Sequence, residues 1–400
     1  MGAIYTPAGD RLLSQPDYKG SVRDADTGSQ RGSRVLAGAG ATASHTDGRT
    51  MLTSAFDKSA ALWQVSADAE PLADGGTGKK ATPTGSVANR RWRGFNAFRS
   101  GLLRADGQIA VSLADGAGGQ EVIRLTDPAT DRPSGTPAPH YPGWIVRAVA
   151  FSPDGRWFAT GSNAETRYAG ELRLWDASTG RLLLPPIPHT NWVAALAFQP
   201  DGKVLAAGDY DGLVRFWDTS TGKEIGRPLP QGEMVLSLAY SPDGTMLAVG
   251  LASEKGKTGT RLWDNRTRQP LGELLPSTEY VTRLEFRPDG RALLAGGGNR
   301  LTRLWDTTRG QVLGEPIIDE AAGGFRPGGR GFLTLGKDGT VKLRDAATGE
   351  VLARLLTSSS PAICAAFRGD GGLVAAGFED GAVRLCAPAT NQPVGPPRVM

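Results

Sequence analysis

One short pattern recurs along this chain and limits what the chain can fold into. An aromatic residue, a variable residue and Pro-Asp-Gly stand together four times, and a Trp-Asp pair follows each copy after 19 to 24 residues. Weaker copies bring the number of full units to eight. A chain that repeats a unit of about 40 residues builds one body from stacked copies, so repeats have to be counted before domains. The four clear copies begin at Phe151, Phe198, Tyr240 and Phe286, and their pairs begin at Trp175, Trp217, Trp263 and Trp305.

Each unit divides into four short strands. Asp-Gly pairs, with or without a preceding proline, supply the fixed or positive φ that tight hairpins need. The 55 glycines and 27 prolines of the 400 residues fit such a turn-rich chain, and no segment has the apolar spacing of a helix. In the unit that contains Trp217, we expect strands at 193–198, 204–207, 213–217 and 224–229.

This pattern resembles the WD40 family, and the resemblance covers nearly the whole chain. It implies an all-β fold, a propeller of four-stranded antiparallel blades around a central channel. We expect one domain of eight blades, in which residues 29–400 form eight full repeats and residues 1–28 a partial first repeat. Seven or nine blades remain alternatives.

The resemblance also implies a set of structural residues inside the blades. The family joins a His, a turn Asp and the Trp of the repeat by hydrogen bonds. In this chain His189, Asp211 and Trp217 fit that set best. Trp175, Trp263 and Trp305 occupy the same repeat position as Trp217.

The composition argues against catalysis and against metal or cofactor binding. The chain has three histidines and two cysteines, with no His-x-x-x-His or Cys-x-x-Cys spacing. The hairpin aspartates are explained by turn chemistry. We therefore expect no catalytic, cofactor or metal residues. The absence of a secretory signal and of an apolar run of about 20 residues favours a cytoplasmic protein without a membrane span. We also expect the propeller to be monomeric.

An insertion at about 72–103 has its own chemistry. It interleaves arginine with aromatic residues, a composition typical of interface hot spots. Because the connections between blades open on one propeller face, we expect this loop to contact a protein or peptide there; a solvated basic loop is the alternative. A net charge of +4 without a basic stripe disfavours nucleic acid. The candidate contacts are Arg90, Arg91, Trp92, Arg93 and Phe95.

Large side chains stand at the start of several first strands, on the same expected face. These are Trp144, Trp192, Met234 and Tyr280. They could contact a partner or pack at the channel mouth. The favoured function is a non-catalytic scaffold or recognition module that binds a protein or peptide. The alternatives are a propeller enzyme of hydrolase or quinone-dependent type, and a structural repeat fragment of a larger protein.

Overall fold

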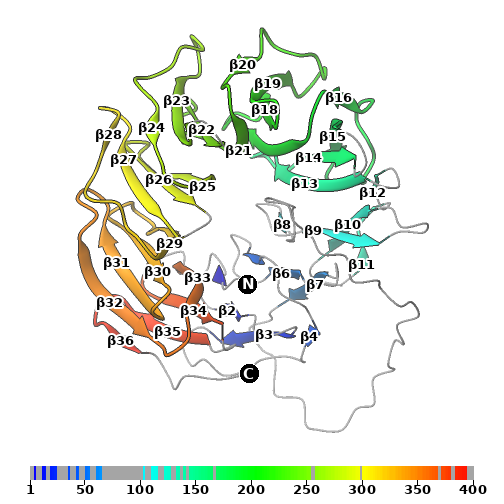
Figure 1. Cartoon of the computed structure of the whole chain (residues 1–400). Helices are drawn as coiled ribbons and strands as arrows, with labels where there is room; N and C mark the ends of the chain where they lie inside the picture. Colours follow the sequence, from blue (N-terminus) through cyan, green and yellow to red (C-terminus); the bar gives the residue numbers. More distant parts are fainter. Residues whose placement is uncertain are drawn as a thin grey trace, which may run out of the picture.

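The structure, a computed structural model, is a succession of small antiparallel sheets arranged around a centre (Figure 1). Up to residue 127 it describes only strands. Beyond that point it describes residues 132–135, 138–140, 144–164, 168–253, 257–297, 300–367, 371–379 and 383–393. The described residues contain no helix, and therefore none that could cross a membrane.

Six sheets follow one another from residue 144 to residue 393, and each joins four strands in chain order. The first strands of neighbouring sheets contact one another, and the last strands lie on the outside of the ring in Figure 1. The six are β13 Trp144–Phe151, β14 Trp157–Ala164, β15 Gly170–Asp176 and β16 Ile187–His189; β17 Val193–Phe198, β18 Val204–Asp209, β19 Leu213–Asp218 and β20 Leu229–Pro230; β21 Met234–Tyr240, β22 Met246–Ala252, β23 Gly259–Asp264 and β24 Leu275–Pro276; β25 Val281–Phe286, β26 Ala292–Gly297, β27 Thr302–Asp306 and β28 Gln311–Val312; β29 Glu320–Phe325, β30 Gly331–Gly336, β31 Thr340–Asp345 and β32 Val351–Thr357; β33 Ala362–Phe367, β34 Val374–Phe378, β35 Val383–Ala387 and β36 Gln392–Pro393.

Three further sheets precede these six, and their strands contact both ends of the series. β1 lies beside β33, β1 contacts β5, β5 contacts β8, and β8 contacts β13. The strands are β1 Ile4–Tyr5, β2 Arg11–Ser14, β3 Lys19–Asp24 and β4 Val35–Leu36; β5 Thr42–Ser44, β6 Thr50–Ser54 and β7 Ala60–Gln64; β8 Leu102–Leu103, β9 Ala110–Asp115, β10 Glu121–Asp127, β11 Arg132–Pro133 and β12 Ala138–Pro139.

The described strands thus form nine sheets, whereas eight blades were expected. The difference lies at the start of the chain. We expected residues 1–28 to be only a partial repeat, but β1 to β3 pair in order and take β4, which follows residue 28, as their fourth strand. The all-β, four-stranded architecture itself agrees with the expectation.

The Pro-Asp-Gly segments form the tight turn between the first and second strands. Gly155, Gly202, Gly244 and Gly290 all have φ between +69° and +73°, a conformation that only glycine adopts without strain. The aspartate of each turn accepts the backbone N–H two residues later; the N–H of Lys203, for example, lies 3.0 Å from Asp201 Oδ1. The repeated motif is therefore explained by backbone geometry.

Neighbouring sheets fit together through a glycine on one sheet and a valine on the next. A Cβ placed on Gly208 of β18 would lie 2.3 Å from Cγ1 of Val235 on β21. Gly161 stands against Val193 in the same way, at 2.6 Å. Because these valines are fully buried, the two sheets approach closely only where a side chain is missing.

A β-bulge recurs at this same level of the first strand in all six later sheets. One residue on the first strand has no partner of its own on the second strand, which leaves it outside the regular ladder. In β13, β17 and β21 the bulged residues are Arg147, Ala194 and Leu236.

Candidate interaction surface

The bulged residues help to form the base of a cluster of aromatic side chains. Ala194 and Leu236 are buried together with Ala252, the last residue of β22. Tyr210, Met234 and Tyr280 are partly buried and pack against them. Met234 begins β21, Tyr210 follows β18 and Tyr280 precedes β25, so three successive sheets meet at this cluster.

Trp192 extends the cluster toward β13. Its ring centroid lies 5.1 Å from that of Tyr210 and 6.5 Å from that of Tyr168, on which it stacks. Tyr168 is 82% exposed, the highest value among the large apolar side chains of the described residues. We call Tyr168, Trp192, Tyr210, Met234 and Tyr280 the aromatic surface.

Arg147 is a buried residue that packs against the aromatic surface. Only 6% of this residue is exposed, and its guanidinium carbon lies 4.7 Å from the Trp192 ring centroid. Its Nε donates to Asn163 Oδ1 at 2.5 Å. Burial raises the pKa of Tyr210, although the charge of Arg147 acts in the opposite direction, so Tyr210 stays a neutral hydrogen-bonding phenol at physiological pH.

Asp211 holds the loop that carries Trp192. The side chains of Thr190 and Asn191 both donate to its carboxylate, the latter at 2.8 Å. Asn191 Oδ1 in turn accepts the backbone N–H of Trp192 at 2.8 Å. The predicted pairing of Asp211 with His189 is therefore wrong. β18 ends at Asp209, which faces His189, while Asp211 stands in the turn that follows.

Trp175 belongs to a complete chain of hydrogen bonds inside its sheet. Its Nε1 donates to Thr160 Oγ1 at 3.0 Å, and this hydroxyl lies 3.2 Å from Nε2 of His140. Burial, assisted by the charge of Arg173, lowers the pKa of His140 from 6.5 to about 3. The ring is therefore neutral across the physiological range.

In the next sheet the histidine has an aspartate partner, but the hydroxyl that would join it to the tryptophan is missing. His189 Nδ1 lies 3.4 Å from Asp209 Oδ2, but Ala207 stands where Thr160 stands in the sheet before. His189 Nε2 and Trp217 Nε1 consequently have no hydrogen-bond partner among the described residues.

One added hydroxyl is expected to complete that set. In the variant Ala207→Ser, the new Oγ can accept from Trp217 and bond His189, so we expect about 1 kcal/mol of added stability in urea unfolding. Ala206→Ser, on the opposite face of the same strand, is the control and should lose about 1–3 kcal/mol by burying an unpaired hydroxyl. A loss at Ala207 equal to that at Ala206 would contradict the assignment.

The sheet that begins at β29 replaces the tryptophan by an ionic set. Arg344 occupies the position of Trp175, and its Nε donates to Thr334 Oγ1 at 3.1 Å. Thr334 donates to the carboxylate of Glu320, which also binds Arg344 Nη2 at 2.9 Å and the ammonium of Lys342. Burial raises the pKa of Glu320, but these three donors outweigh it and hold the pKa below its usual value.

The sequence-predicted residues fall into four groups. Trp175, Trp217, Trp263 and Trp305 are all buried, as structural residues would be. Trp192, Met234 and Tyr280 lie in the aromatic surface. Trp144, at the start of β13, is half-buried and is not among the side chains that pack on Ala194 and Leu236. Arg90, Arg91, Trp92, Arg93 and Phe95 lie outside the described residues.

Sequence reasoning missed Tyr168, Tyr210 and Arg147. Tyr168 lies between β14 and β15, and the sequence held a signal for it, because Phe151 and Trp175 are 24 residues apart whereas Phe198 and Trp217 are 19 apart. Tyr210 directly precedes the Asp-Gly turn. Arg147 gave no signal, because its place on the surface depends on the bulge in β13.

The repeat aspartates carry out turn chemistry. The carboxylate of Asp218 accepts hydrogen bonds from the hydroxyl groups and N–H groups of Ser220 and Thr221, which lower its pKa. A lowered carboxyl pKa suits a turn and not an acid catalyst that must hold its proton near neutral pH. Across the described part of the chain, no three His, Cys, Asp or Glu side chains group as metal ligands would.

Comparisons with known proteins agree with the repeat pattern. The family model described as "WD domain, G-beta repeat" matches residues 132–176, 183–218 and 268–306. Apoptotic protease-activating factor 1 of Homo sapiens is 42% identical over 74 residues, which cover 16% of this chain and 6% of that protein. The Lissencephaly-1 homolog of Dictyostelium discoideum is 43% identical over 54 residues, 13% of this chain and 12% of that protein. The chain thus spans only a small part of the length of these relatives.

Among solved structures, the computationally designed protein Ika8 matches with a TM-score of 0.57 at 23% identity. The match covers 73% of this chain and 84% of the designed one, and it bears on the fold alone. The family-model matches show WD40 repeats at these three positions, and the four-stranded antiparallel sheets are consistent with the blades of a WD40 propeller.

Proposed function

We propose that this chain is a non-catalytic recognition module and that a protein or peptide binds on the aromatic surface. WD40 repeats are generally protein-interaction modules, and the two named relatives are partial matches of that kind. The observation that carries the proposal is the exposed ring of Tyr168 stacked on Trp192, at one end of a contiguous set of large side chains.

Rigidity supports this proposal. Large aromatic side chains that are already fixed lose little conformational entropy when a partner binds, and they dominate interface hot spots. Trp192 is held by Tyr210, by Arg147 and, through its backbone, by Asn191 and Asp211. The surface is therefore prepared for binding before a partner arrives.

The arginine-rich insertion remains a second candidate contact for the same partner. Its residues Arg90, Arg91, Trp92 and Arg93 were expected on the same face as the aromatic surface. Arginine can bind carboxylates through two parallel hydrogen bonds, which would suit an acidic segment of the partner.

Binding by a selected peptide tests the proposal. A displayed peptide library is selected on the immobilised protein, and affinities of a selected peptide are measured by calorimetry. We expect Trp192→Ala to weaken binding by at least about 2 kcal/mol, the scale of a hot spot. The matched control is Leu352→Ala, an exposed apolar residue on the outer strand β32, which should bind unchanged.

The outcomes separate the two candidate contacts. Loss of binding with Trp192→Ala supports the aromatic surface. Loss only when Arg90, Arg91, Trp92 and Arg93 are all changed to alanine moves the site to the insertion, and this loss should shrink as salt is raised. Selected peptides that bind all these variants equally would overturn both assignments.

A further inference from the structure

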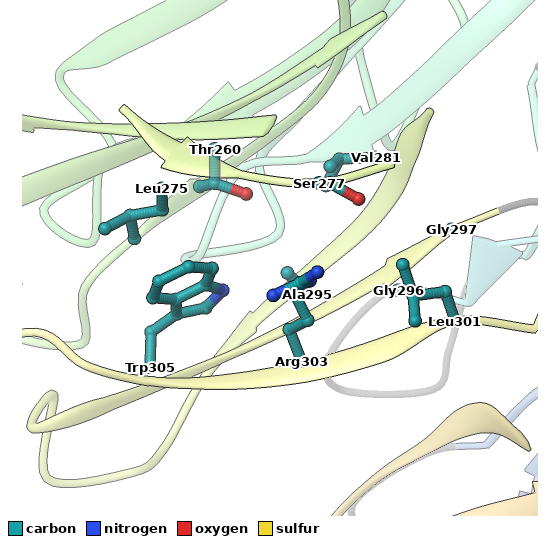
Figure 2. Close-up of a pocket in the computed structure, with 10 residues that line it drawn as sticks. All are labelled: Thr260, Leu275, Ser277, Val281, Ala295, Gly296, Gly297, Leu301, Arg303 and Trp305. Atoms are coloured by element: carbon teal, nitrogen blue, oxygen red, sulfur yellow. The ribbon is translucent and has the colours of Figure 1, made fainter. Parts of the chain in front are cut away.

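A pocket lies between the sheet of β21 to β24 and the sheet of β25 to β28. It is a small recess that is partly open to solvent, with a cavity volume of only about 10 Å³. Figure 2 shows Thr260, Leu275 and Ser277 on one side of it and Ala295, Arg303 and Trp305 on the other. Gly297 at the end of β26 and Leu301 just before β27 also line it.

The pocket occupies the position that His189 and Asp209 fill two sheets earlier. Ser277 stands four residues before Val281, as His189 stands four residues before Val193. Gly297 pairs with Val281 as Asp209 pairs with Val193. Smaller side chains at both positions, together with Ala295 in place of the threonine of the Trp175 set, leave the space unfilled.

Hydrogen-bond donors surround this space. Trp305 is only 4% exposed, and its Nε1 has no hydrogen-bond partner among the described residues. The same holds for the buried Nε of Arg303. Ser277 Oγ accepts the backbone N–H of Glu279 at 3.2 Å, so its own proton is available to donate. In Figure 2 the indole and guanidinium nitrogens and the hydroxyl of Ser277 face the same space.

Among the described residues, no carboxylate forms an ion pair with Arg303. In two other sheets the equivalent arginine is paired: Arg215 binds Glu224 at 3.0 Å, and Arg173 binds Glu171. Val312 lies opposite Trp305 where Glu224 lies opposite Trp217, and Leu301 takes the position of Glu171. No ion pair of Arg303 exists within the described part of the chain, and none of the ten lining residues is acidic.

We propose that this pocket binds a small monovalent anion, of the size of chloride or of a carboxylate group. Two buried N–H donors and an unbalanced guanidinium charge are costly unless an acceptor meets them. A single anion would accept from Trp305 Nε1, Arg303 and Ser277 at once. A cation would be repelled by the guanidinium charge of Arg303.

Indole signals of the intact protein test this proposal. The chain is labelled with ¹⁵N-tryptophan, and the signal of Trp305 among its nine tryptophans is assigned with Trp305→Phe. Sodium chloride and sodium formate are titrated separately. We expect the Trp305 N–H signal to move and saturate with at least one of them, and to respond identically when potassium replaces sodium.

Two variants and one control show whether the anion binds in this pocket. Arg303→Gln keeps a polar side chain without the charge. It should weaken anion binding at least about tenfold, as expected for the loss of a charged hydrogen bond. Ala295→Ser places an acceptor beside Trp305 and fills the space, so the saturable movement should disappear. Ala207→Ser makes the same change two sheets earlier and should leave it intact.

The proposal fails if the Trp305 signal shows no saturable movement with either anion. It also fails if Arg303→Gln, with its other indole signals unchanged, binds as well as the parent protein. Saturation with chloride alone would identify a halide site, whereas saturation with formate would identify a carboxylate site.

Discussion

Replacing Glu320 with alanine is expected to cost about 3–5 kcal/mol of unfolding free energy, because it leaves buried cations without their carboxylate. Glu320 is 7% exposed and accepts hydrogen bonds from Lys342, Arg344 and Thr334. In this sheet the ionic set stands where Trp175 and its partners stand four sheets earlier, so the loss affects the interior of the sheet.

Urea unfolding followed by circular dichroism measures this loss. The control is Glu379→Ala, whose 3.8 Å pair with Arg300 is 54% exposed on the glutamate side and should contribute at most about 1 kcal/mol. Similar small losses in both variants would show that the Glu320 set contributes little.

The same carboxylate predicts a pH dependence. The folded pKa of Glu320 lies below its ordinary value of 4.5. Its ionised form therefore stabilises the fold above about pH 4.5, and this contribution is lost as the pH falls through the folded pKa. Compared with the parent protein, Glu320→Gln should lose less stability over that acid range.

Trp217→Ala is expected to be similarly destabilising, at about 3–5 kcal/mol, because it opens a cavity in a packed sheet. Trp217 is buried among Ala159, Phe198 and Leu205. Thermal and urea unfolding measure the effect, and a loss below about 1 kcal/mol would contradict the interior position of this residue.

Phenylalanine variants separate packing from hydrogen bonding. Trp175→Phe removes the indole N–H that donates a hydrogen bond to Thr160, whereas Trp217→Phe removes an N–H that has no partner among the described residues. We therefore expect Trp175→Phe to lose about 1 kcal/mol more than Trp217→Phe. Equal losses would mean that the bond to Thr160 adds nothing to stability.

Local sequence signals predicted the first three strands of each clear repeat and the turns between them well, because Pro-Asp-Gly has few other conformations available and Trp-Asp recurs at one place in four sheets. The fourth strand expected at 224–229 was wrong, since β20 spans only Leu229–Pro230. The partners of buried polar groups were harder to predict. Asp209 and Asp211 are two residues apart, and only the end of β18 decides which of them faces His189. Arg344 stands where other sheets have a tryptophan, and its partner Glu320 lies on another strand, so no short motif could predict this pairing.

The aromatic surface was predicted only in part for a related reason. Trp192, Met234 and Tyr280 stood at matching positions in successive repeats, so their common face could be inferred. Arg147 on β13 contacts Trp192, which precedes the first strand of the neighbouring sheet. This contact requires the bulge that displaces Arg147 from the ladder of β13. Bulges arise from pairing between strands and are not encoded in a short motif.

These recurring bulges give each of the six later sheets one position whose residue can vary without altering the strand pairing. The displaced residue has no partner of its own in the ladder, so its identity can change while the register of every strand stays the same. Arg147, Ala194, Leu236 and Thr282 are the displaced residues of four consecutive sheets, and they are chemically unlike one another. Substitutions confined to this row would change the buried base on which the aromatic surface packs, and so the placement of its side chains, without changing the strand pairing of the ring.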